Sequence, residues 1–112
     1  MNGVQQILSE YERLALAWDS ERNSKKANRI FDKLHSLALI LRESAEGRRG
    51  LESLLGHDNR GVRLKAGSDC LAWGSAKAIS ALEGLVQPRG FHSLDAEMTL
   101  REYRAGRMRF DW

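Results

Sequence analysis

Cysteine and proline are nearly absent from the 112 residues: the chain has one of each, Cys70 and Pro88. A single cysteine cannot form an intramolecular disulfide, and a fold that needs none is typical of a reducing compartment, so we expect the protein in the cytoplasm. The sequence also lacks any long stretch in which β-branched and polar residues alternate, which argues against strands. These absences favour an all-α fold.

Long apolar runs are missing as well. The longest, residues 37–41, is about a quarter of the roughly 20 residues that cross a bilayer. Residues 1–6 have neither the basic region nor the apolar region of a secretory signal. With 42% hydrophobic and 29% charged residues, the chain has the size and composition of one water-soluble domain. We therefore predict a single helical domain over residues 1–112 and no association with a membrane.

What the sequence does have is a helical period. Apolar residues recur every three to four positions, which places them on one face of a helix. This spacing predicts six helices, at about residues 3–18, 20–44, 51–55, 60–73, 76–86 and 93–104. The third is short, and its boundaries are the weakest in the pattern.

Capping residues indicate where these helices begin and end. We expect Asp19 or Ser20 to cap the second helix, and Gly47 and Gly50 to bracket a turn before the third. Further start signals are Asp58 or Asn59 for the fourth helix and Ser75 for the fifth, and further stop signals are Gly56, Pro88 and Gly106.

Two of the predicted helices carry apolar residues on two sides. Val62 and Leu64 lie on nearly opposite faces of helix 60–73, and Met98 and Leu100 lie on different faces of helix 93–104. A helix that is covered twice is typical of stacked layers. The sequence therefore predicts about six helices in stacked antiparallel hairpins, similar to an α-solenoid of the HEAT type.

No residues combine into a catalytic or metal-binding motif. His35, His57 and His92 stand on separate segments without the spacing of metal ligands. Cys70 falls on an apolar helix face, where a thiol is buried and unreactive. His92 and Asp95 share a helix face, but an acidic residue there is better explained by the positive end of the helix. We predict no enzyme activity, no cofactor and no metal site.

The clearest polar feature is a basic stripe on the second helix. Its cations recur at helical spacing, roughly opposite the apolar face, and therefore share one exposed face: Arg22, Lys25, Lys26, Arg29 and Lys33. Such a face either binds phosphates or an acidic protein surface, or is simply solvated. No aromatic residue interleaves the stripe, which makes nucleic acid the less favoured partner.

Arginines and aromatic residues gather near the C-terminus. Arg101, Arg104 and Trp112 are residue types that are enriched at protein interfaces, and we predict them as binding residues in addition to those of the stripe. The alternative is that Phe110 and Trp112 fold back over the last helix as a terminal cap.

The C-terminal half carries a more specific pattern. The runs VRLKA at residues 62–66, CLAWG at 70–74 and above all DAEMTLREYRAGRMRF at 95–110 resemble the bacterial family called domain of unknown function 2019. The resemblance covers about residues 51–110. It implies a compact all-α fold with HEAT-like hairpins and no known catalytic residues. Members look like small proteins encoded beside polymorphic toxins, which implies a role as a cognate immunity protein.

Three functions are compatible with these features. The favoured one is an immunity protein that binds a cognate toxin domain one to one and occludes it. The second is a helical adaptor or a self-associating domain, which would use the second apolar face of helix 93–104 if that face is uncovered in the monomer. The third is a nucleic-acid-binding module that uses the basic stripe. The oligomeric state does not follow from the sequence.

Overall fold

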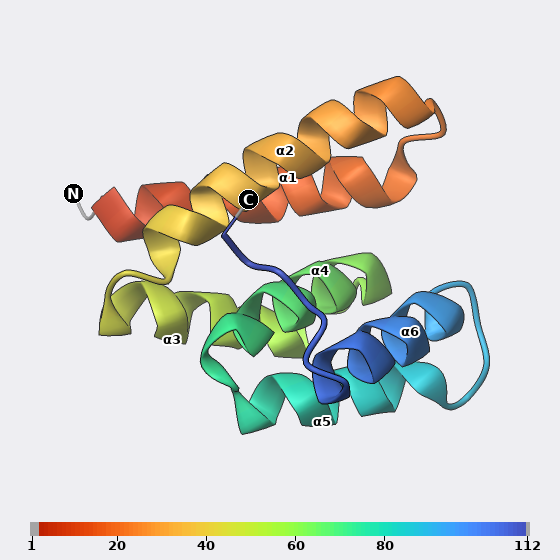
Figure 1. The fold of residues 1–112 in the computed structure, drawn as a ribbon. Helices are drawn as coiled ribbons and strands as arrows, with labels where there is room; N and C mark the ends of the chain where they lie inside the picture. Colours follow the sequence, from red (N-terminus) through yellow and green to blue (C-terminus); the bar gives the residue numbers. More distant parts are fainter. Residues whose placement is uncertain (1–2, 112) are drawn as a thin grey trace.

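The chain folds into six α-helices and two short 3-10 turns (Figure 1). The computed structural model describes residues 3–111, and within this range it contains no β-strand. The α-helices are α1 (Gly3–Ser20), α2 (Ser24–Leu41), α3 (Ala45–Ser53), α4 (Arg60–Cys70), α5 (Ala76–Val86) and α6 (Ser93–Arg104). The turns η1 (Leu54–Gly56) and η2 (Leu71–Trp73) extend α3 and α4. The predicted all-α fold is therefore confirmed.

Side-chain caps explain where α2, α3, α4 and α5 begin. In each, a side-chain oxygen accepts a hydrogen bond of 2.9–3.2 Å from the backbone N–H three residues further on: Asn23, Ser44, Asn59 and Ser75. Such a cap satisfies a donor that the start of a helix leaves without a partner. The predicted caps Asn59 and Ser75 are confirmed. The prediction of Asp19 or Ser20 for α2 is wrong, because α1 continues to Ser20, whose hydroxyl donates to carbonyl oxygens of α1 itself.

The two glycines that were expected to bracket a turn lie inside α3 instead. A Cβ at position 47 would lie 1.8 Å from the carbonyl oxygen of Leu41, and one at position 50 would lie 3.0 Å from Leu8. Gly47 and Gly50 therefore allow α3 to approach α2 and α1 closely, and they do not turn the chain. The predicted start of this helix near residue 51 is wrong for that reason.

The other helices surround α4. Figure 1 shows the α1–α2 hairpin on one side of α4 and the α5–α6 hairpin on the other, with α3 beside the higher-numbered end of α4, where Glu52 accepts hydrogen bonds from Trp73 and Ser75. One hydrophobic core runs through these layers, and its largest fully buried side chains include Tyr11, Leu34, Leu51, Leu71 and Leu82. Val62 and Leu64 of α4 are both buried. The prediction that α4 is covered on opposite faces is confirmed.

The prediction that α6 is also covered on both of its apolar faces is wrong. Ala96 and Leu100 are buried in the core, but Leu94 and Met98 on the other side are 59% and 50% exposed. The cause is that α6 is the last helix of the described residues, so its inner face packs on α5 and no element packs on its outer face.

After α6 the chain turns back across the molecule. Gly106 has a left-handed φ of 71°, which glycine adopts without steric cost, and α6 ends just before it as predicted. Residues 107–111, which we call the C-terminal strap, then run toward the end of α2 (Figure 1). There Arg42 Nη1 donates to the carbonyl oxygen of Phe110 at 3.2 Å, and the Arg42 guanidinium pairs with Asp111. Phe110 thus folds back onto the core but reaches across to α2.

No helix among residues 3–111 is long and apolar enough to cross a membrane.

Candidate functional site

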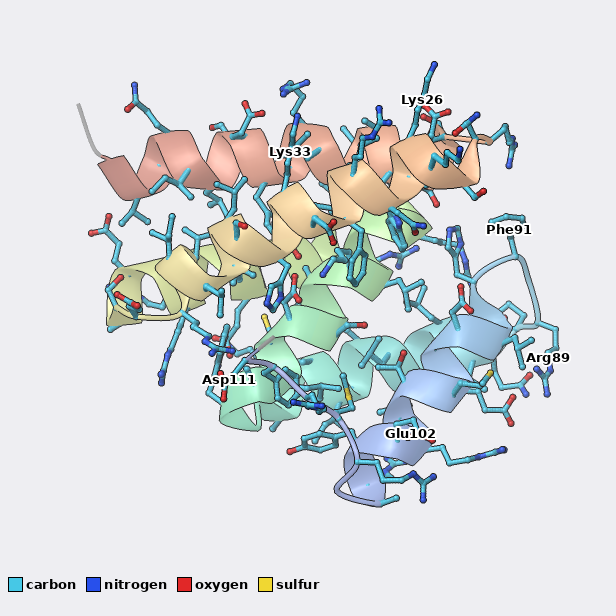
Figure 2. All side chains as sticks on the ribbon, turned by 45° about the horizontal axis from the view of Figure 1, so that its top comes forward. Lys26, Lys33, Arg89, Phe91, Glu102 and Asp111 are labelled. Atoms are coloured by element: carbon cyan, nitrogen blue, oxygen red, sulfur yellow. The ribbon has the colours of Figure 1, made fainter. Side chains whose placement is uncertain are left out.

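The basic stripe lies on the outer side of the α1–α2 hairpin. Its five cations, Arg22, Lys25, Lys26, Arg29 and Lys33, are all exposed, as the sequence predicts. Within residues 3–111, no acidic side chain forms an ion pair with any of them. In Figure 2, Lys26 and Lys33 point away from the side of the hairpin on which Glu102 and Asp111 lie. The stripe is therefore a positively charged, solvated surface that faces away from α6.

The predicted binding residues of the C-terminal half lie on a different surface. Arg101 and Arg104 are exposed on α6 at its border with α5. Arg104 pairs with Glu83 of α5 at 2.8 Å, and Arg101 Nη2 lies 3.9 Å from Glu97 Oε1. Trp112 lies outside the described residues. The structure therefore does not bring Arg101 and Arg104 together with the basic stripe.

An apolar patch covers the outer side of α6. It consists of Phe91, Leu94 and Met98, which are 78%, 59% and 50% exposed, and we call it the α6 patch. The helical spacing places Leu94 and Met98 on one face, and Phe91 precedes them in the loop that leads into the helix. Arg89 and Glu97 form an ion pair of 3.3 Å beside it. The other exposed large apolar side chains in residues 3–111, Leu16 and Ile40, lie on α1 and α2.

A cavity of about 390 Å³ opens next to the α6 patch, between α2, α4, α6 and the C-terminal strap. Most of its wall is apolar, with Trp18, Phe31, Leu39, Met98, Met108 and Phe110 among the lining side chains. Met98 belongs to both the patch and the cavity, so the two surfaces are continuous. Trp18 and Phe31 contact each other in a tilted arrangement with ring centres 6.4 Å apart.

A buried polar cluster forms the floor of this cavity. Lys65 Nζ donates to both carboxylate oxygens of Asp69, each at 2.9 Å, and the Tyr11 hydroxyl donates to the same carboxylate. Lys65 Nζ also lies 4.5 Å from the centre of the Phe31 ring, close enough for cation–π attraction. The side chains of Lys65 and Asp69 are only 4% and 13% exposed. Their charges therefore neutralise each other inside the protein.

Burial sets the protonation of two other groups. It raises the pKa of Tyr11 well above its usual 10.0, and the neighbouring Asp69 carboxylate raises it further, so Tyr11 is a neutral donor. Burial likewise raises the pKa of the Cys70 thiol, and the predicted burial of Cys70 is confirmed. Among residues 3–111, no three His, Cys, Asp or Glu side chains are placed to hold a metal ion.

Two histidines connect α1 to the rest of the molecule. His57 Nε2 lies 2.9 Å from Glu12 Oε2, and a backbone N–H donates to its Nδ1, so the ring proton is on Nε2. His92 Nε2 lies 2.6 Å from Asp19 Oδ1. The partner of His92 is therefore Asp19 and not Asp95, which lies in the first turn of α6 as the helix-end argument predicts.

The cavity was not predicted from the sequence. One signal for its floor was present: Lys65 and Asp69 carry opposite charges at i and i+4 in a helix that was predicted to be buried on both faces. Charged residues are almost never fully buried unless they are paired, so such a pair indicates a mutual contact. The strap has no apolar period, and nothing in its sequence indicates where it crosses.

A family model described as Domain of unknown function (DUF2019) matches residues 7–103. The chain belongs to the DUF2019 family. The resemblance drawn from residues 51–110 is confirmed, but its extent differs, because the DUF2019 match also includes α1 and α2 and ends before the strap. No curated protein and no solved structure matches the chain. The HEAT-like arrangement of this DUF2019 protein therefore stays a prediction.

Proposed function

We propose that this DUF2019 protein is a non-catalytic protein-binding domain that neutralises a cognate toxin domain by one-to-one occlusion. The α6 patch is the observation that supports binding, since Phe91 in the loop before α6 and Leu94 and Met98 on α6 are all at least half exposed. Clusters of this kind on a water-soluble protein mark interaction surfaces. The kind of partner comes from the family resemblance, which implies an immunity protein.

Occlusion requires a preformed surface and slow dissociation. The inner face of α6 is held in the core by Ala96 and Leu100, and Ser93 Oγ donates to the carbonyl oxygen of Leu85 at 2.9 Å, which fixes the start of α6 on α5. A surface that is already ordered loses little entropy on binding, and this favours a long-lived complex. We place the α6 patch at the centre of the interface and the charge of Arg101 at its rim.

Co-expression with the proposed toxin domain, which the family resemblance places in a neighbouring gene, tests this function. We expect the chain to restore growth, and the purified proteins to form a one-to-one complex with a Kd on the order of nanomolar or tighter. The double substitution Leu94→Lys and Met98→Lys should abolish both effects, because it places two charges in an apolar contact. If the unmodified chain does not protect the cells, the proposal that its partner is this toxin domain is wrong.

A matched control uses the basic stripe. Lys25→Glu with Lys26→Glu also changes two exposed residues, and it should leave dissociation unchanged and affect at most the rate of association. If this control loses protection while the α6 variant keeps it, the interface lies on α2 and the assignment to α6 is wrong.

The α6 patch also supports a second function, in which the chain is a self-associating adaptor. Light scattering over a range of concentrations measures this directly. A dimer that the Leu94→Lys and Met98→Lys variant abolishes would support self-association, and a monomer at every concentration would reject it.

A further inference from the structure

The cavity beside α6 has a cover of its own. The C-terminal strap passes over it and contributes Met108, Arg109 and Phe110 to its lining. Arg42 ties down the far end of the strap by binding the carbonyl oxygen of Phe110 and the carboxylate of Asp111. A helix of another protein has to displace the strap to enter, whereas a small molecule fits beneath it. The volume, about 390 Å³, lies within the range of small-molecule sites.

Acidic and basic side chains line different walls of the cavity. Asp95 and Glu102 line it from α6, whereas Arg42 lines it from the C-cap of α2 and Arg109 from the strap. The ion pair of Lys65 with Asp69 on the floor of the cavity carries no net charge. Glu102 is already paired with Arg107 at 2.9 Å, so the negative charge of the α6 side comes mainly from Asp95, and a ligand with one negative end is attracted to the arginine side.

The strap itself indicates what the arginine side accepts. Phe110 packs its ring on the core, and the next residue, Asp111, places its carboxylate on Arg42. An apolar group followed by a carboxylate is thus already bound in this corner. The Asp111 side chain is 87% exposed while that of Arg42 is 23% exposed, so the bond of Asp111 to Arg42 is weak enough to exchange.

We propose that the cavity binds a small apolar carboxylate. Its body lies against Phe31, Met98 and Met108, and its carboxylate takes the place of Asp111 on Arg42. Methionine side chains suit this role because they adapt to the shape of an apolar ligand. The site does not depend on the toxin partner, and either proposal can fail without the other.

Decanoate is the probe, and the methyl groups of Met98 and Met108, labelled with carbon-13, are the reporters. We expect decanoate to shift both methyl signals saturably at concentrations where it does not form micelles. Decanol has the same chain without the charge, and it should bind about tenfold more weakly. Decyltrimethylammonium should bind no better than decanol. The absence of a shift with decanoate, or equal affinity for decanoate and decanol, would overturn the proposal.

Substitutions locate the site. Arg42→Gln should remove the preference for decanoate over decanol, and Asp111→Asn should raise the affinity for decanoate severalfold because it releases Arg42. Thr99→Trp fills the cavity from α6 and should abolish binding of both probes. Arg49→Gln removes an exposed arginine that does not line the cavity and serves as the control. Unchanged decanoate binding in the Thr99 variant, or in both the Arg42 and the Asp111 variants, would contradict the assignment.

Discussion

Lys65→Met is expected to destabilise the protein strongly, although methionine has nearly the same shape as lysine. The substitution removes the ammonium that donates to both oxygens of Asp69 at 2.9 Å, at a site where the two side chains are 4% and 13% exposed. Removing one partner of a buried ion pair costs about 3–5 kcal/mol. Asp69 keeps the hydrogen bond from Tyr11 and a small exposed fraction, so we expect the lower end, about 3 kcal/mol.

The double variant Lys65→Met with Asp69→Leu tests the reasoning. It removes both charges and leaves the Tyr11 hydroxyl without its acceptor, which costs about 1 kcal/mol. It should therefore be about 2 kcal/mol more stable than Lys65→Met alone. For a domain of this size, about 4 °C of Tm corresponds to 1 kcal/mol, so the single variant should melt about 12 °C below the unmodified chain.

Thermal and urea denaturation followed by circular dichroism measure both variants. Lys65→Arg is the matched control, because it keeps the positive charge and should lose less stability than Lys65→Met. If Lys65→Met is as stable as the unmodified chain, or if the double variant is less stable than the single one, then the pair does not act as a buried, mutually neutralised unit.

Three further predictions concern single positions. Gly47→Ala should lower the free energy of unfolding by about 3 kcal/mol or more, because its Cβ would lie 1.8 Å from the backbone oxygen of Leu41, and urea denaturation measures this. Gly84→Ala should raise the free energy of unfolding by about 0.5–1 kcal/mol in the same assay, because the position is exposed on α5 and the added Cβ would meet nothing within 4 Å outside the adjoining backbone. The raised pKa of Tyr11 means that the unfolded chain loses the phenolic proton first, so stability should fall as the pH rises above 10.0. In a Cys70→Ala background, which removes the similar effect of the thiol, Tyr11→Phe should reduce this fall, and an unchanged fall would contradict the argument.

The helices could be predicted because their period and most of their caps are local features of the sequence. Asn59 and Ser75 begin helices by bonding to a backbone N–H three residues away, so no tertiary information is needed. Gly47 and Gly50 misled the prediction because their role depends on contacts with Leu41 and Leu8, which lie on other helices. A glycine that forms a turn and one that permits close packing look alike in a sequence.

The exposed surfaces likewise include features that the sequence predicts and features that it does not. The exposure of the basic stripe followed from its position opposite the apolar face of the same helix. The exposure of Leu94 and Met98 did not follow, because the sequence shows that a helix face is apolar but not whether another element covers it. The cavity depends on where the strap crosses, and this is decided by the contact of Arg42 with Phe110 and Asp111, nearly 70 residues further along the chain.

Amide hydrogen exchange of the chain, free and bound to the proposed toxin domain, tests the role of α6 most directly. Binding through the α6 patch predicts that exchange slows within residues 91–104 and stays unchanged within residues 22–33. Slowed exchange confined to residues 22–33, or no difference anywhere in the chain at saturating toxin domain, would contradict it.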